Sequence, residues 1–216
     1  MQIRPASDSS LLVSFGDAIS IDAHRQVMQL TQALAERAVG LRNLHPAFAS
    51  VLIDFDPRRW THQQVEELVR QRIAAQPGVA AGGRLVEIPV RYGGVDGPDL
   101  EEVAHHTGLT PRRVVELHAS AEYPVYFVGF APGFPYLGGM PPELATPRLP
   151  APRKRVPAGS VAIGGAQTGV YPLESPGGWR LIGRTPLRLF DPSADPPALL
   201  RMGDRVRFVP VEDQPH

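Results

Sequence analysis

Residues 126–143 read YFVGFAPGFPYLGGMPPE, and this stretch decides which kind of fold the second half of the chain can adopt. It holds four glycines, four prolines and five aromatic residues, and it carries no charge before Glu143. Glycine and proline fix tight turns, so they interrupt helices and favour short strands joined by loops. Aromatic side chains bury large apolar areas. The stretch therefore predicts β structure with a turn-rich segment that carries an aromatic surface.

The same composition continues through the second half of the chain. Residues 127–190 contain 11 glycines and 11 prolines, and apolar segments that resemble strands lie between them. Short strands separated by turns are typical of a β-barrel or a β-sandwich. The segments are YPVYFVGF (123–130), SVAIGG (160–165), WRLIGRTPLRLF (179–190) and DRVRFVPV (204–211).

The segment RLVEIPVRY, residues 84–92, is the clearest strand of the chain because its apolar residues alternate. Pro89 cannot donate a ladder hydrogen bond, which favours an edge or a bulge at that position. Two short helices are expected after this strand. Pro98 is predicted to occupy the first position of one helix, and Thr110 with Pro111 is predicted to open the other.

The first part of the chain indicates a small α+β domain. Residues 11–15, 41–46 and 49–56 are predicted strands, and a helix is expected from a Ser20 cap to about Ala38, with Gly40 terminating it. The spacing of Thr61 and Gln64 matches a capping box that opens a second helix. The order strand, helix, strand, strand, helix, with a further strand to follow, predicts two helices on one face of an antiparallel sheet.

Residues 80–83, AAGG, are small and turn-prone, which is typical of a linker. We therefore expect two domains, residues 1–82 and residues 83–216.

Composition limits the classes of function. The 216 residues are 43% hydrophobic and 20% charged, which predicts a packed core. Lysine plus arginine equals aspartate plus glutamate at 22 each, so no global basic field favours nucleic acid or an anionic membrane. The absence of cysteine excludes disulfides, thiolate catalysis and thiolate-bound zinc. With no signal-like apolar segment, the expectation is a soluble cytoplasmic protein.

The segment 99–120 has the spacing of a DNA-binding helix-turn-helix, in which Arg112 and Arg113 would face the groove. The favoured interpretation is a helical hairpin that caps a barrel, because β structure follows it and the net charge is zero. His105, His106 and His118 do not have the spacing of metal ligands, so no metal site is expected. Neither Ser160 nor Ser175 lies in the elbow motif of a serine hydrolase.

Two further segments are candidates for anion binding. GGAQTGVYPLESPGGW, residues 164–179, lacks a P-loop ending, yet its glycines are able to present backbone N–H groups to an anion. Tight hairpins explain the same glycines. The cations Arg148, Arg153, Lys154 and Arg155 fall within eight residues. They either clamp a phosphate or a carboxylate, or they are a solvated surface.

Three long motifs carry a resemblance to a known family. FVGFAPGFPYLGGM, RKRVPAGSVAIGGAQTGVYPLESPGGW and LIGRTPLRLF resemble the signature of the 5-oxoprolinase B subunits, the KipI-type group that is also labelled allophanate hydrolase subunit 1. The dense part covers about residues 126–190, and the rest of the chain fits the family layout more loosely. The resemblance implies an N-terminal ferredoxin-like α+β domain followed by a mostly-β, cyclophilin-like barrel.

The resemblance also implies partners and a reaction. The B subunit would act with the KipA-type C subunit and the LamB/YcsF-type A subunit to open 5-oxoproline to glutamate with ATP, and ATP and Mg²⁺ would bind in the assembled complex. The single chain would then be inactive. Two alternatives stay open: a carboxyltransferase-like subunit of a urea or allophanate pathway, with biotin on another chain, and a KipI-type inhibitor of a sporulation histidine kinase.

Residue types within the motifs suggest roles in such a reaction. A rigid loop at the barrel mouth would present aromatic rings to a pocket or to an interface, unless these rings are ordinary core. Cations would stabilise a transferring phosphate, and polar side chains would orient a small carboxylate or amide. The expected catalytic residues are Glu174 (a base or magnesium ligand), Arg184 and Gln167. The expected substrate-binding residues are Phe130, Phe134, Tyr136, Arg153, Lys154, Arg155, Thr168, Tyr171 and Ser175.

Overall fold

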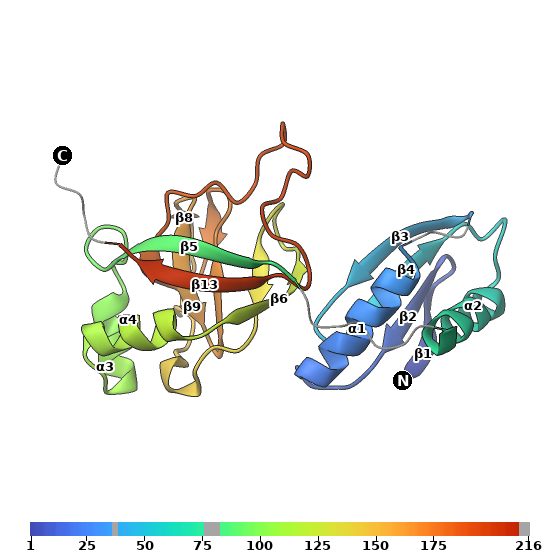
Figure 1. Cartoon of the computed structure of the whole chain (residues 1–216), viewed down its shortest axis with the longest axis horizontal. Coiled ribbons are helices and arrows are strands. Elements are labelled where there is room, and N and C mark those ends of the chain that lie inside the picture. Colours follow the sequence, from blue (N-terminus) through green and yellow to red (C-terminus); the bar gives the residue numbers. More distant parts are fainter. Residues whose placement is uncertain (36–38, 76–82, 212–216) are drawn as a thin grey trace. The chain divides into compact units, whose positions relative to one another are not determined.

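The computed structural model describes residues 1–35, 39–75 and 83–211, and the chain divides into two compact units, Met1–Ala81 and Gly82–His216 (Figure 1). The expected linker at residues 80–83 lies outside the described residues except for Gly83. No helix among the described ranges is both long enough and apolar enough to cross a membrane.

The first unit is a four-stranded antiparallel sheet with the strand order β1-β2-β4-β3. Two helices pack against each other and against this sheet, so both lie on one face of it (Figure 1). Alternate side chains of β2 and β4 point into the interface, where Val13, Val51 and Ile53 are fully buried. The elements are β1 (Gln2–Ser7), β2 (Ser10–Ser14), α1 (Ile21–Ala33), β3 (Leu41–Pro46), β4 (Ser50–Phe55) and α2 (His62–Ala75).

Local capping signals of this unit are confirmed. The Ser20 hydroxyl accepts a hydrogen bond from the Ala23 backbone N–H at 3.1 Å, which caps the start of α1. Gln64 Oε1 accepts from the Thr61 backbone N–H at 2.9 Å, and the Thr61 hydroxyl accepts from the Gln64 N–H at 3.3 Å. These two bonds form the predicted capping box of α2.

The predicted end of α1 is wrong. The helix ends at Ala33 with Leu34 as its C-cap, and the predicted end at Ala38 lies outside the described residues. Gly40 is therefore not the terminating glycine of this helix. Its φ of +106° instead serves the turn into β3, where the indole of Trp60 packs against it.

The strand expected after α2 does not complete this sheet. Residues 85–92 form β5, which belongs to the second unit, and the fourth strand of the first sheet is β1 at the N-terminus. Ser7 pairs with Ser10, so β1 and β2 form a hairpin that closes locally. A four-stranded α+β unit is thus observed, and its ferredoxin-like assignment stays a prediction.

The second unit contains a closed barrel with the strand order β10-β7-β6-β13-β5-β12-β9. The prediction of a mostly-β barrel is confirmed, whereas its cyclophilin-like character stays a prediction. A two-stranded ribbon, β8 with β11, lies beside it. The elements are β5 (Leu85–Tyr92), β6 (Tyr123–Val128), β7 (Pro135–Leu137), a 3₁₀ turn (Pro142–Leu144), β8 (Arg153–Val156), β9 (Ser160–Gly164), β10 (Gln167–Val170), β11 (Ser175–Gly177), β12 (Arg180–Arg184) and β13 (Arg205–Pro210).

Strand β5 pairs in parallel with β13, although the two are far apart in the sequence (green and red in Figure 1). Pro89 is opposite Val209, and the ladder to β12 covers only Arg91 and Tyr92. Strand β5 is therefore not an edge strand, because it lies inside a closed barrel. At Pro89, however, it is paired with a neighbouring strand on one side only, which is the position a proline tolerates.

Helices α3 (Leu100–Thr107) and α4 (Pro111–Ser120) pack against each other and against the barrel, where Val103 and Val114 are fully buried. Thr110 caps α4 and Pro111 is its first residue, as predicted. The position predicted for Pro98 is wrong, because Asp99 is the N-cap and Leu100 begins the helix. The buried apolar face of this hairpin supports the interpretation that it caps the barrel.

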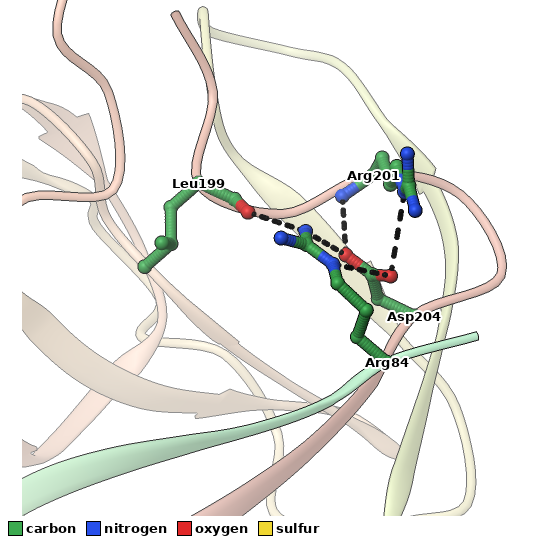
Figure 2. Close-up of polar contacts among 4 residues, drawn as sticks. All are labelled: Arg84, Leu199, Arg201 and Asp204. Atoms are coloured by element: carbon green, nitrogen blue, oxygen red, sulfur yellow. Dashed lines mark hydrogen bonds and ion pairs between the residues drawn. The ribbon is translucent and has the colours of Figure 1, made fainter. Parts of the chain in front are cut away.

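An ion pair fixes the start of β5 to the loop before β13 (Figure 2). The guanidinium of Arg84 donates to the carboxylate of Asp204, whose side chain is 1% exposed, and to the carbonyl of Leu199 at 2.9 Å. The Arg201 backbone N–H donates to the same carboxylate at 3.1 Å. The barrel closure between these two strands therefore includes a fully hydrogen-bonded buried charge.

Candidate functional site

A cavity of about 310 Å³ opens beside the barrel and is built from the motif-rich part of the sequence. This volume falls at the lower end of the range for small-molecule sites, about 300–1,000 Å³. The residues that line it come from the aromatic loop, from the segment before β8, and from β11 with its neighbours. They are Phe130, Phe134, Tyr136, Arg148, Leu149, Pro152, Tyr171, Pro176, Gly177, Gly178 and Trp179.

Phe134 is the centre of the aromatic wall. Its ring meets Tyr136 at a centroid distance of 5.2 Å, Tyr171 at 5.5 Å and Trp179 at 5.8 Å, each edge to face. Such pairs contribute about 0.5–1.5 kcal/mol each beyond the area they bury. Phe134, Tyr171 and Trp179 also belong to one small buried cluster with aliphatic residues of the barrel, and Tyr136 packs against it.

The loop between β6 and β7 has a constrained backbone. Its turn is closed by hydrogen bonds from the Gly129 N–H to the Phe134 carbonyl and from the Phe134 N–H to the Ala131 carbonyl, both 3.0 Å. A side chain at Gly133, where φ is +81°, would lie 2.7 Å from Phe190. Phe130 also has a positive φ, +66°, and its side chain is 68% exposed at the cavity rim. A non-glycine residue in this conformation costs about 1–2 kcal/mol, so the loop holds Phe130 outward at an energetic cost.

Two glycines allow the walls to approach one another. A Cβ on Gly177 would lie 2.4 Å from the Tyr171 hydroxyl, and a Cβ on Gly164 would lie 2.6 Å from the Trp179 ring. The indole therefore rests directly on the backbone of β9. Two of the glycines that the sequence suggested as backbone anion donors, Gly164 and Gly177, are needed here for close packing of two aromatic side chains.

Arg148 is the one charged residue among the described residues that line this cavity. Its guanidinium carbon lies 5.7 Å from the centroid of the Trp179 ring, a cation–π contact. The segment around it is held by the backbone, because Thr146 pairs with Gly165 and the Leu149 N–H donates to the Gly178 carbonyl at 2.7 Å. Among the described residues, no carboxylate pairs with Arg148.

Four of the predicted substrate-binding residues come together in this cavity: Phe130, Phe134, Tyr136 and Tyr171. Thr168 is fully buried instead and bonds to His118 Nε2 at 2.8 Å and to the Ala162 carbonyl at 3.0 Å. Ser175 lies on β11, and its buried hydroxyl has no hydrogen-bond partner among the described residues.

The basic cluster of β8 is divided between different partners. Arg153 donates to the buried Asp99 at 2.7 Å, while its other terminal nitrogen, Nη1, is buried with no partner in the described structure. Arg155 pairs with Glu174 at 2.6 Å on the exposed β8–β11 ribbon, and Lys154 is exposed. None of these residues lines the aromatic cavity.

The other predicted catalytic residues also lie elsewhere. Arg184 lines a second cavity of about 620 Å³, where its Nε donates to the Ala158 carbonyl at 3.0 Å. Gln167 begins β10 opposite Gly164 and is partly buried. Among the described residues, no cluster of three acidic or histidine side chains is present to hold a metal ion. Of the expected set, Arg184 alone lines the second cavity, and none of the three residues lines the aromatic cavity.

Electrostatics at the aromatic cavity favour a neutral phenol and a positive field. Burial raises the pKa of the Tyr171 hydroxyl, and the nearby Trp179 backbone together with the charges of Arg148 and Arg153 acts in the opposite direction. Tyr171 thus stays protonated near neutral pH and adds no negative charge beside Arg148.

The site residues predicted from the sequence leave out several residues of this lining, and Arg148 and Trp179 are the two with the most distinctive side chains. Arg148 is one of four nearby cations but has no predicted role of its own, and Trp179 has none either. One feature of the sequence does point to Trp179: it is one of only two tryptophans in the chain, and it ends the glycine-rich motif. Their pairing across 31 positions of sequence is a tertiary property, which no local pattern indicates.

The family model described as "Carboxyltransferase domain, subdomain C and D" matches residues 1–200. The chain is 43% identical to the 5-oxoprolinase B subunit of Bacillus subtilis strain 168, covering 99% of this chain and 94% of that protein. It is 52% identical to the 5-oxoprolinase B subunit of Escherichia coli O157:H7 over 83% of this chain and 84% of that protein. The B subunit of Haemophilus influenzae is 44% identical, with 97% of each chain covered.

Solved structures agree with these relationships. The protein TTHA0988 superposes with a TM-score of 0.86 at 42% identity, and this chain covers 41% of its length. The conserved uncharacterized protein PH0987 of Pyrococcus horikoshii gives a TM-score of 0.60 at 46% identity, with 98% of each chain covered. Urea amidolyase of K. lactis shares the fold at 21% identity and a TM-score of 0.77. On this identity and coverage, the chain belongs to the carboxyltransferase subdomain C and D family and, within it, to the group of 5-oxoprolinase B subunits.

Proposed function

We propose that this chain is the B subunit of an ATP-dependent 5-oxoprolinase, which opens the lactam of 5-oxoproline to give glutamate. The observation that carries the proposal is the 43–52% identity to three proteins named as this subunit, over most of each chain. Fungal urea amidolyases match at only 23–25% identity and along 13% of their length. They do not favour the carboxyltransferase alternative.

The chemistry of the aromatic cavity supports the proposal. 5-Oxoproline is a small, nearly flat ring with a carboxylate, and the described lining of the cavity combines ring surfaces with the cation Arg148. Such a lining suits a compact anion with apolar faces. None of the described residues that line the cavity is acidic and able to serve as a base, so the cavity is suited to holding the substrate rather than to completing the reaction.

The remaining catalytic groups are proposed to come together on assembly. An unstrained lactam resists hydrolysis, and transfer of a phosphoryl group to its carbonyl oxygen would create a good leaving group. That step needs cations around the phosphate. ATP and Mg²⁺ would bind in the complex with the KipA-type C subunit and the LamB/YcsF-type A subunit. Arg153, Lys154, Arg155 and Arg184 are the proposed contacts of this chain, with Glu174 and Gln167 as further catalytic candidates.

Reconstitution tests the proposal directly. The chain is expressed alone, with the KipA-type partner, and with both the KipA-type and LamB/YcsF-type partners, and glutamate formation from 5-oxoproline is measured with and without ATP. We expect ATP-dependent turnover only in the three-subunit mixture. A chain that turns over alone at the rate of the mixture would contradict the assignment of an inactive subunit, and a mixture that forms no glutamate would contradict the substrate.

A further inference from the structure

Arg148 differs from its fellow arginines in what surrounds it. Among the described residues of the second unit, the arginines other than Arg148 and Arg184 pair with a carboxylate. Those pairs involve Arg84, Arg91, Arg112, Arg113, Arg153, Arg155, Arg180, Arg188, Arg201, Arg205 and Arg207. Arg184 at least has a fixed acceptor, the Ala158 carbonyl. Among the described residues, the guanidinium of Arg148 lies over the face of the Trp179 indole and pairs with no carboxylate.

The position of Arg148 is preorganised. Thr146 and Gly165 exchange two backbone hydrogen bonds, of 3.1 and 2.8 Å, just before it. Leu149, the next residue, is held by its 2.7 Å bond to Gly178. An anchored backbone on both sides of the residue lowers the entropy lost when its side chain orders around a ligand.

The guanidinium carbon of Arg148 lies over the Trp179 ring, 5.7 Å from its centroid. When an arginine packs against a ring, its N–H donors still point outward, and two of them match the two oxygens of a carboxylate. Among the described residues that line the cavity, no aspartate or glutamate competes for these donors. The buried phenol of Tyr171, kept protonated by its raised pKa, does not repel an incoming anion.

We propose that the cavity is a carboxylate-binding site of this single chain, in which Arg148 holds the carboxylate and the rings of Phe134 and Trp179 hold a flat ring of the ligand. The ligand class is a small cyclic carboxylic acid. Its identification as 5-oxoproline rests on the proposed function, whereas the site itself rests on the geometry. The partner subunits are not needed for this binding.

Isothermal titration of the full chain tests the proposal with matched ligands. 5-Oxoproline carries the carboxylate, 5-oxoprolinamide replaces it with a neutral amide of nearly the same shape, and benzoate is a flat acid unrelated to the reaction. The wild-type chain is expected to bind both acids and to bind the amide much more weakly. Loss of one charge-assisted contact corresponds to a roughly 10- to 150-fold weaker binding.

Three variants assign the effect to one side chain. Arg148→Gln should weaken 5-oxoproline binding by that factor and, more tellingly, should remove the preference for the acid over the amide. Arg148→Lys keeps the charge but not the paired donors, so it should restore only part of the affinity. Arg112→Gln, which changes an exposed arginine on α4, is the matched control and should bind as the wild type does. Thermal melts of each variant verify that the chain is folded.

The outcomes separate this inference from the proposed function. The inference is overturned if the wild-type chain does not distinguish acid from amide, if it binds neither acid, or if Arg148→Gln binds as tightly as the wild type. If the assembled complex forms glutamate but any of these results is obtained, the proposed function is supported and the carboxylate site is rejected. If the chain binds acids selectively through Arg148 but the complex does not hydrolyse 5-oxoproline, the carboxylate site is supported and the proposed function is rejected.

Discussion

The guanidinium of Arg84 and the carboxylate of Asp204 form a two-point ion pair, with Nη2–Oδ2 at 2.6 Å and Nε–Oδ1 at 3.3 Å (Figure 2). The carboxylate is almost fully buried, while the arginine side chain is about half exposed. Burial acts to raise the pKa of Asp204, but hydrogen bonds and charge, first those of Arg84, hold this pKa below its ordinary value. The pair therefore keeps a buried negative charge in place between β5 and β13.

Replacement of Arg84 by methionine is expected to destabilise the second unit by about 1–3 kcal/mol, because a buried carboxylate loses its main donor. Half of the arginine is solvated, so the loss stays below that of a fully buried pair. Urea unfolding measures the change. The control is Arg112→Met, whose exposed pair with Glu116 should be worth about 0–1 kcal/mol. Equal losses in the two variants would contradict the role given to Asp204.

Acid should weaken the barrel through His118. This residue is fully buried, and burial lowers its pKa to about 3. Its Nδ1 bonds to the Tyr92 hydroxyl at 2.8 Å and its Nε2 to the Thr168 hydroxyl at 2.8 Å, and its ring stacks on Phe208. Two phenols, Tyr92 and Tyr123, pack against it, and burial raises the pKa of each.

The sign follows from the two pKa values. An unfolded histidine has a pKa of about 6.5, so between about pH 6.5 and 3 the unfolded chain binds a proton that the folded chain does not. Stability should fall as the pH drops through this window. Urea midpoints at pH 7, 6 and 5 measure the slope, which should be shallower in His118→Gln, whatever that variant costs at pH 7. An unchanged slope would show that His118 is not the group responsible.

Neighbouring glycines give a matched test of the cavity wall. A methyl group at Gly177 would meet the Tyr171 hydroxyl at 2.4 Å, whereas at Gly178 the nearest atom would be 3.7 Å away, an ordinary contact. Gly177→Ala should push Tyr171 into the cavity, cost about 1–3 kcal/mol of stability and weaken 5-oxoproline binding. Gly178→Ala should change both quantities little. Titration and thermal melts of the two variants measure this, and a larger effect at Gly178 would mean that the wall is built differently.

Features set by bonds between near neighbours in the sequence were predictable. The caps at Ser20, Thr61 and Thr110 each join a side chain to a backbone N–H three residues on, so the residue pattern contains the whole interaction. Turn residues between short apolar segments predicted a β-barrel or a β-sandwich, and the family resemblance implied the barrel. The end of α1 was not predictable, because Gly40 matches a terminating glycine by type although the helix stops at Ala33.

The site was predictable in part for the same reason. Phe130, Phe134 and Tyr136 are close in the sequence and were candidates for the wall of a pocket or an interface, or for ordinary core. They line the cavity together. Arg153 and Arg155 looked equivalent to Arg148 as cations. Only the fold shows that these two have carboxylate partners. Arg153 pairs with Asp99, which is far away in the sequence, and Arg155 pairs with Glu174 across the β8–β11 ribbon. Among the described residues, Arg148 has no such partner. This difference depends on the tertiary structure, so no local sequence pattern indicates it.

The role of Glu174 separates binding from catalysis. It lies outside the lining of the aromatic cavity and pairs with Arg155 on an exposed ribbon, so Glu174→Gln should leave 5-oxoproline binding by the single chain unchanged. An exposed pair contributes about 0–1 kcal/mol, so the melting temperature should change little as well. If Glu174 is the base of the assembled enzyme, kcat should fall by about 10²- to 10⁴-fold. Steady-state kinetics of the reconstituted complex measures this.

Two controls make the result decisive. Arg155→Gln removes the partner of Glu174 but not the carboxylate, so it distinguishes loss of a base from loss of the ribbon ion pair. Arg148→Gln should raise KM through weaker binding, since it removes a contact made with the substrate in its ground state. A Glu174→Gln complex with wild-type kcat would exclude Glu174 as a base. The base would then have to come from a partner protein, because the aromatic cavity of this chain is lined by no carboxylate among the described residues.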